Sequence, residues 1–200
     1  MIEVSLEEGI ATVRLASPET ANALTPAAFS DLTARIADLQ KADSGARALV
    51  LTGSGKVFSA GANLAVLGVA DATSLARDIT DAVLPLQRVL QDGRLPTVAA
   101  VNGVAVGGAV GLALLCDIAV ATCSARFSLV FARLGLVPDT GLTHTLPRLV
   151  GEARARALMM TGADIGAEEA AAIGMIHRCF DDETFATQTQ ALAQQLAWLP

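Results

Sequence analysis

The run TVAAVNGVAVGGAVGLALLCDIAVAT, residues 97–122, decides the fold of this chain. It carries no charged residue before Asp117 and is crowded with glycine and alanine. Continuous apolar runs of this kind are typical of parallel strands that are buried on both faces. The run therefore predicts a buried strand, a glycine turn, a helix of small residues and a second buried strand.

The residues before this run alternate between strand and helix patterns. Residues 2–6 and 10–15 are rich in β-forming residues and are separated by Glu-Glu-Gly, which predicts an opening hairpin. Thr25, followed by proline, supplies the N-cap of a helix whose apolar residues recur at helical spacing. Residues 48–53 are predicted to form a buried strand, and residues 74–91 an amphipathic helix.

The residues after the run form short helical segments, each closed by glycine, and a last helix that begins near residue 181. Strands that alternate with helices indicate an α/β fold. At 200 residues the chain suits a single domain with a sizeable buried core. We expect this domain to span residues 1–200, with a core over about 1–150 and a helical part over about 151–200.

Composition and charge narrow the classes of function. Fourteen basic against twenty acidic residues give a net charge of −6, and aromatic residues make up only 4% of the chain. Without a basic stripe or stacking aromatics, nucleic acid is not an expected partner. The three cysteines, an odd number in apolar surroundings, indicate a reducing compartment, and neither an export signal nor a membrane span is predicted. We therefore expect a cytoplasmic protein.

Two familiar motifs are missing from the sequence, and histidines are few. The stretch TGSGK, residues 52–56, lacks both the first glycine and the hydroxyl residue of a phosphate-binding loop. No G-x-S-x-G motif of a serine hydrolase occurs, and His144 and His177 are the only histidines. We expect no metal site, and we assign His144 to the surface and His177 to a structural role.

Two glycine-rich segments have residues small enough for a close approach to a ligand. One is VFSAGANL, residues 57–64, and the other is NGVAVGGAVGLAL, residues 102–114, which leads from a strand into a helix. The first N–H groups of a helix lack partners, and two converging N–H groups form an oxyanion hole. Small residues equally permit close packing of backbones, which is the commoner use of glycine.

Asp139 lies in the stretch LGLVPDTGLTH, residues 134–144, and allows two interpretations. Pro-Asp-Thr-Gly is typical of a β-turn in which the aspartate caps the next helix. A lone carboxylate in apolar surroundings also suits proton transfer, because burial disfavours its charged form and raises its pKa. The residues by themselves favour the turn.

Six stretches follow one another in a specific order along the chain. They are NALT (22–25), VLTGSGKVFSAGANL (50–64), AAVNGVAVGGAVGLALLCDIAVA (99–121), SARFSLVFARLGLVPDTG (124–141), LPRLVG (146–151) and AEEAAAIGMIHRCF (167–180). This order resembles the crotonase superfamily, which comprises the enoyl-CoA hydratases and isomerases. The resemblance covers nearly the whole chain and implies an α/β, crotonase-like ββα superhelix with a shortened C-terminal helical region.

The resemblance also implies where the site lies. An oxyanion hole would be formed by the N–H groups of Ala60 and Gly108. The asparagine at position 63 departs from the aspartate that is usual in the family, and no separate cofactor is implied, since coenzyme A belongs to the substrate. The residues expected to line the acyl-CoA are Asn22, Ala23, Leu24, Gly61, Ala62, Asn63, Leu64 and Gly107.

Two positions depart from the hydratases of the superfamily, which use two glutamates to hold and activate a water. The corresponding positions here hold Gly111 and Phe131. A water then has no general base, and the phenylalanine makes the pocket drier. Ordinary hydration is therefore not expected, and Phe131 is interpreted as part of the pocket wall.

In a group of crotonase-fold isomerases the working acid lies in a Pro-Asp-Ser/Cys-Gly turn, which Pro-Asp-Thr-Gly matches. Within the superfamily the chain most resembles the phenylacetate-pathway 1,2-epoxyphenylacetyl-CoA isomerases. The resemblance implies that Asp139 takes a proton from C2 of an unsaturated acyl-CoA and returns it at C4, or acts in opening an epoxide ring. The apolar neighbours expected to raise its pKa are Phe131, Leu134, Leu136 and Val137.

Two alternatives stay open. One is a hydratase-like lyase or a thioester hydrolase whose base the sequence does not identify. The other is a subunit that binds acyl-CoA, or a partner subunit, without turnover. The resemblance further implies a homotrimer or a dimer of trimers, with neither a nucleic acid nor a membrane as partner.

Overall fold

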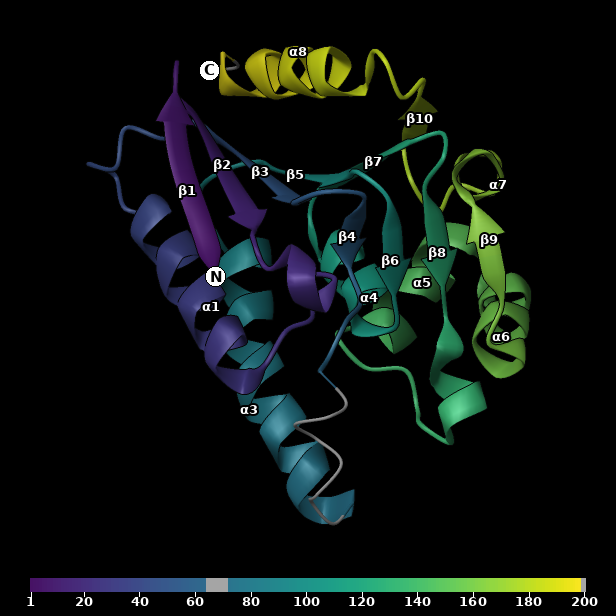
Figure 1. Ribbon diagram of the computed structural model, residues 1–200. Helices are drawn as coiled ribbons and strands as arrows, with labels where there is room; N and C mark the ends of the chain where they lie inside the picture. Colours follow the sequence, from purple (N-terminus) through teal and green to yellow (C-terminus); the bar gives the residue numbers. More distant parts are fainter. Residues whose placement is uncertain (64–71, 199–200) are drawn as a thin grey trace.

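A computed structural model describes residues 1–63 and 72–198 of the chain (Figure 1). Its larger sheet has six strands in the order β1-β2-β3-β5-β7-β10. The first pair is antiparallel, and every other neighbouring pair is parallel. The strands span Ile2–Glu7 (β1), Ile10–Leu15 (β2), Ala48–Gly53 (β3), Thr97–Val101 (β5), Ile118–Thr122 (β7) and Arg178–Phe180 (β10).

A second sheet has four short strands in the order β4-β6-β8-β9. The first three of them each follow a strand of the larger sheet along the chain, and a helix comes next, so the unit strand–strand–helix recurs. This recurrence confirms the predicted α/β class and the ββα superhelix. The strands span Val57–Ser59 (β4), Val104–Val106 (β6), Arg126–Ser128 (β8) and Asp164–Gly166 (β9).

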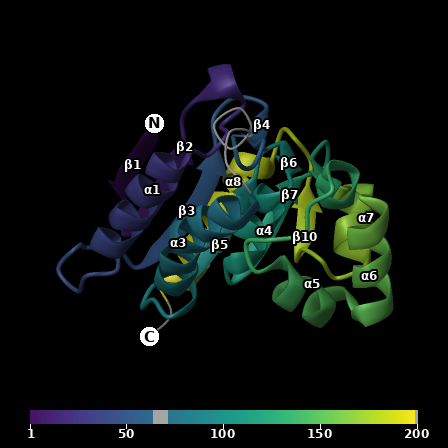
Figure 2. The same ribbon diagram turned by 90° about the horizontal axis from the view of Figure 1, so that it is seen from below.

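The helices pack around and between the sheets (Figures 1 and 2). α1 and α3 lie side by side, and the buried helix α4 lies on the other side of α3, against strands of both sheets. The α-helices span Pro26–Leu39 (α1), Ala72–Gln91 (α3), Gly108–Leu115 (α4), Leu142–Val150 (α5), Glu152–Thr161 (α6), Ala167–Ala172 (α7) and Phe185–Ala197 (α8). Two short 3-10 helices span Pro18–Thr20 (η1) and Val130–Leu134 (η2).

The central strands of the larger sheet are covered on both faces. α8 lies across one face, where Ala193 and Ala197 join a buried cluster with Val50 and Val98 (Figure 1). Leu51 belongs to the larger cluster on the opposite face, with α1, α3 and α4. Successive side chains of a strand point to opposite faces, so a strand between two dry layers is apolar throughout. All six residues of β3 are accordingly buried.

The start of α1 follows the capping signals of the sequence. The Thr25 hydroxyl accepts a hydrogen bond from the Ala28 N–H at 3.2 Å, and proline occupies the first helical turn. The apolar residues predicted to face the core do so. They are Phe29, Leu32, Ile36 and Leu39.

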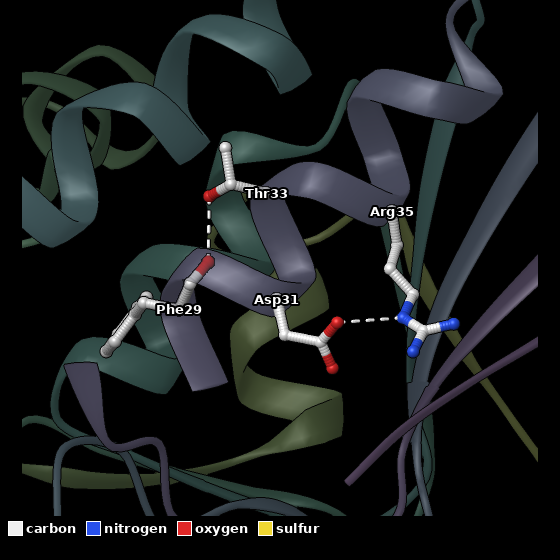
Figure 3. Close-up of polar contacts among 4 residues, drawn as sticks. All are labelled: Phe29, Asp31, Thr33 and Arg35. Carbon is white, nitrogen blue, oxygen red and sulfur yellow. Dashed lines mark hydrogen bonds and ion pairs between the residues drawn. The ribbon is translucent and has the colours of Figure 1, made fainter. Parts of the chain in front are cut away.

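The outer side of α1 carries ordinary surface contacts (Figure 3). Asp31 accepts a hydrogen bond from Arg35 at 2.9 Å, one helical turn away. Nearby, the Thr33 hydroxyl donates to the carbonyl of Phe29 at 2.8 Å. The exposed Asp31–Arg35 pair is expected to contribute little to stability, and the Thr33 hydrogen bond is part-buried.

Several details differ from the sequence-based expectations. The strand β6 was not predicted, because three residues are too few to show a period. The region 151–200, expected to be helical, also contributes the strands β9 and β10. Leu64, expected beside coenzyme A, lies outside the described residues.

All three cysteines are free thiols: Cys116 is buried, and Cys123 and Cys179 are half-buried. Within the part of the chain that the structure describes, no helix has both the length and the apolar character needed to cross a membrane.

Candidate active site

The loop after β4 presents one main-chain N–H away from its neighbouring strand. Leu24 and Ala62 form an isolated parallel bridge, in which the Leu24 N–H donates to the Gly61 carbonyl at 2.8 Å. The Asn63 N–H donates back to the Leu24 carbonyl at 3.0 Å. Because N–H groups alternate in direction along an extended chain, the Ala62 N–H points to the other side. It meets no acceptor among residues 1–63 and 72–198.

The start of α4 lies directly against this loop. A β-carbon on Gly61 would lie 2.5 Å from the Val106 carbonyl oxygen and 3.4 Å from the Gly108 nitrogen. Gly61 has a φ of +80°, so both the space and the backbone require glycine. Gly108 is the first residue of α4, and its N–H is likewise without an acceptor among the described residues. The fold thus brings the N–H groups of Ala62 and Gly108 to one place.

The prediction that Ala60 supplies one of the two N–H groups is wrong. The Ala60 N–H donates to the carbonyl of Ala21 at 2.9 Å and is therefore occupied. The alternation that leaves Ala62 unpaired depends on the bridge to Leu24, a residue distant in the chain. The sequence signal that could have found it is the small residue directly after Gly61, in a segment already expected to bind the substrate.

Asn22 holds the loops around this site in place. Its side chain donates to the carbonyls of Ser54 at 3.0 Å and Val57 at 2.8 Å, and it accepts from the Ser17 N–H at 2.9 Å. Its own carbonyl accepts a hydrogen bond from the Ser59 hydroxyl at 2.7 Å. Asn22 is buried, and its polar atoms are used within the protein. The neighbouring Ala23 is half-buried, and its contact with coenzyme A stays a prediction.

Asp139 reaches the same place from the loop between η2 and α5. Its Oδ1 atom lies 3.1 Å from the point that a β-carbon on Gly108 would occupy, and it accepts a hydrogen bond from the Thr140 hydroxyl at 2.8 Å. Burial raises the pKa of the Asp139 carboxyl, and the hydrogen bond from Thr140 opposes that rise. The predicted direction of the pKa is confirmed. A carboxylate with a raised pKa beside two unpaired N–H groups is typical of proton transfer.

The apolar surroundings predicted for Asp139 are only partly present. Phe131 is buried, and its ring edge comes within 3.8 Å of the point where a β-carbon on Gly107 would lie. Leu134, Leu136 and Val137, however, are 51%, 37% and 78% exposed. These three residues are therefore corrected to surface positions, because the loop after η2 turns outward. The neighbours of the Asp139 carboxylate are instead the start of α4 and the Thr140 hydroxyl.

Position 111 has no room for a side chain. A β-carbon on Gly111 would lie 2.6 Å from the Thr140 carbonyl oxygen and 2.7 Å from its β-carbon. Thr140 therefore fills the space that a carboxylate at this position would need. The packing around position 111 therefore excludes a glutamate there, in agreement with the glycine in the sequence.

The histidines lie outside this arrangement of groups. His144 is exposed on α5, as predicted. His177 is also exposed, and its main-chain N–H donates to the Ala119 carbonyl at 2.8 Å, which fits a structural role. Within the described residues, no three His, Cys, Asp or Glu side chains gather in a way that could hold a metal ion. That the chain uses no metal or cofactor stays a prediction.

Comparisons with known proteins show which family the chain belongs to. The family model for enoyl-CoA hydratase/isomerase matches residues 5–199. The chain is 41% identical to the "Probable enoyl-CoA hydratase" of Rhodobacter capsulatus over 196 residues, which is 98% of this chain and 75% of that protein. It is 40% identical to the 1,2-epoxyphenylacetyl-CoA isomerase of Escherichia coli over 199 residues, again 98% and 75% of the two chains.

Solved structures give the same answer for the fold. The crystal structure of an enoyl-CoA hydratase subunit from Geobacillus kaustophilus superposes with a TM-score of 0.91 at 33% identity, covering 100% of this chain and 76% of that one. The repeated strand–strand–helix unit and the paired sheets thus define a crotonase-fold protein. More specifically, the chain belongs to the enoyl-CoA hydratase/isomerase family and is an enzyme of the crotonase superfamily.

Proposed function

We propose that this enzyme is an isomerase of unsaturated acyl-CoA thioesters. In this proposal the N–H groups of Ala62 and Gly108 bind the thioester oxygen, and Asp139 moves a proton between C2 and C4. The observation that carries the proposal is a single half-buried carboxylate placed beside two main-chain N–H groups that have no acceptor within the described residues.

The chemistry needs only these three groups. A proton next to a thioester carbonyl is weakly acidic, because its removal places negative charge on the carbonyl oxygen. A preorganised N–H donor stabilises such an oxyanion by about 2.7–4 kcal/mol in a well-studied hydrolase. Asp139 takes the C2 proton as the enolate forms and returns it at C4 as the double bond moves to C2–C3. Proton and electrons then balance without a water or a redox partner.

The site also argues against hydration. Hydration needs a water held and activated by a base, and the structure offers neither carboxylate of the hydratases. Thr140 occupies the space at Gly111, and Phe131 is buried and apolar. The similarity to an epoxyphenylacetyl-CoA isomerase adds a second substrate, since an epoxide next to a thioester could be opened at the same oxyanion-binding groups.

The first prediction concerns Asp139→Asn. The amide cannot accept the C2 proton, so isomerisation of a 3-enoyl-CoA should fall by at least about 100-fold. The measurement follows the 2-enoyl-CoA product, with 2-enoyl-CoA and an epoxide thioester as further substrates. Asp31→Asn, which removes an exposed carboxylate on α1, is the matched control and should leave the rate unchanged.

Each result decides between the alternatives. Isomerisation that persists in Asp139→Asn removes this residue from the mechanism. Hydration of a 2-enoyl-CoA that survives the substitution indicates a hydratase with another base. Binding of a CoA thioester without turnover of any of the three substrates indicates a binding subunit.

A further inference from the structure

Thr140 is an unusual residue for its position. Its side chain is 4% exposed, and its φ is +49°, in the left-handed region that branched residues rarely adopt. Backbone strain of this kind persists only where the surroundings hold it in place, and it is common at functional sites. The strained backbone and the buried hydroxyl make Thr140 a candidate functional residue.

The hydroxyl of Thr140 is used to hold the carboxylate. Its Oγ1 atom donates to Oδ1 of Asp139 at 2.8 Å, and it also lies 2.9 Å from the point where a β-carbon on Gly108 would be. Among the described residues, the one other group that favours the charged form of Asp139 is its own main-chain N–H. Across residues 1–63 and 72–198, no charged side chain contributes to the pKa of this carboxyl. Its orientation therefore depends on a neutral neighbour.

The residue at position 111 determines whether Thr140 can occupy its place beside Asp139. The Thr140 carbonyl oxygen and β-carbon come within 2.6 Å and 2.7 Å of the point where a β-carbon on Gly111 would lie. Any larger residue at position 111 must push Thr140 away, and with it the hydroxyl that Asp139 accepts from. Gly111 and Thr140 thus form one packing unit.

We propose that Thr140 is a positioning residue, whose buried hydroxyl fixes the Asp139 carboxylate beside the oxyanion-binding groups, and that Gly111 leaves the space it requires. The inference rests on the proposed isomerase function. Transfer of one proton between two carbons demands a carboxylate in a fixed place, and a displacement of about 1 Å can lower such a rate by about 100-fold.

The test compares Thr140→Val with Thr140→Ser. Valine keeps the shape and removes the hydroxyl, while serine keeps the hydroxyl and removes the methyl group. Thr140→Val should lower kcat for 3-enoyl-CoA isomerisation by about 10- to 100-fold with little change in KM, and Thr140→Ser should recover most of that loss. Thr33→Val on α1, whose hydroxyl donates only to a helix carbonyl, is the control and should match the unmodified enzyme.

The pH profile gives a readout that a merely structural role would not move. The base must be ionised, so kcat/KM falls as pH drops through the pKa of Asp139. The Thr140 hydrogen bond lowers that pKa. Its removal in Thr140→Val should therefore move the acid limb of the profile to higher pH, and Thr140→Ser should return it. The same shift is expected in the carboxyl ¹³C titration of Asp139 by NMR, which needs no turnover.

The outcomes separate the two proposals. If Asp139→Asn is inactive while Thr140→Val keeps both the kcat and the acid limb of the unmodified enzyme, the positioning role is overturned and the isomerase function stands. If Asp139→Asn remains active, the isomerase function itself fails. A Thr140→Val protein that does not fold is replaced by Gly111→Ala, which keeps the hydroxyl and displaces it; an unchanged acid limb in that variant likewise overturns the inference.

Discussion

Gly108 lies against the Thr140 hydroxyl and the Asp139 carboxylate, which leave little space for a side chain at this position. A methyl group there would lie 2.9 Å from the Thr140 hydroxyl oxygen and 3.1 Å from Oδ1 of Asp139. Gly108→Ala should therefore displace the carboxylate and lower isomerisation by about 100-fold. Alanine favours a helix over glycine, so the melting temperature should not fall by a comparable extent.

The measurement pairs steady-state kinetics with thermal unfolding. Gly166→Ala is the matched control, because a β-carbon at Gly166 meets nothing within 4 Å and its φ of −77° suits alanine. Full activity in Gly108→Ala would show that the start of α4 does not set the position of Asp139.

At the scale of residues, the sequence identified Asp139 through its turn motif, and the direction of its pKa through the expectation of burial. It misassigned one N–H donor, and it misjudged Leu134, Leu136 and Val137. An exposed apolar loop and a buried one look alike in sequence, since the difference lies in where the loop turns. Asp139 lies close to the start of α4, which the chain brings near it only on folding.

At the scale of elements, α1 depends on a local signal that can be removed. Thr25→Ala removes the hydroxyl that accepts a hydrogen bond from the Ala28 N–H, so this N–H loses its side-chain acceptor. The free energy of unfolding should fall by about 1 kcal/mol, measured by denaturant titration. Thr33→Ala, which removes a hydroxyl bonded to a helix carbonyl in the middle of α1, should change it much less. Equal losses in the two variants would contradict the capping role.

The elements themselves were largely predictable. The opening hairpin, α1, β3, α3 and the pieces of the central run follow from periodicity, capping residues and glycine turns. The three-residue strands were not predictable from the sequence, because so short a strand is defined by its pairing with another strand. β6, for example, is recognised through its pairing with β4 and β8 rather than by its own residues.

At the scale of the whole molecule, stability comes from two dry layers on the larger sheet. Leu51 is fully buried in the cluster on one face, so Leu51→Ala should lower the free energy of unfolding by about 2–5 kcal/mol. Leu6→Ala, the same change at a residue of β1 that is 44% exposed, should cost far less. Chemical denaturation of both variants checks the comparison, and similar losses would contradict the layered core.

The assembly and location of the enzyme stay predictions at this scale. A homotrimer or a dimer of trimers is expected from the family resemblance, and a cytoplasmic location from the composition. The chain spans about three quarters of the length of the relatives reported above. Light scattering of the purified protein measures the first expectation directly.

The amino-acid sequence by itself determined the α/β class and the order of the main elements, and it placed a lone carboxylate, Asp139, in a proline turn. These properties follow from short-range patterns, such as two-sided apolar strands, capping residues and a proline turn. Only the tertiary structure decided which main-chain N–H groups lack an acceptor among the described residues and which hydroxyl donates to Asp139. Those outcomes depend on contacts between Leu24 and Ala62, between Gly61 and Gly108, and between Gly111 and Thr140. Such contacts arise when separate elements pack, so no local pattern encodes them.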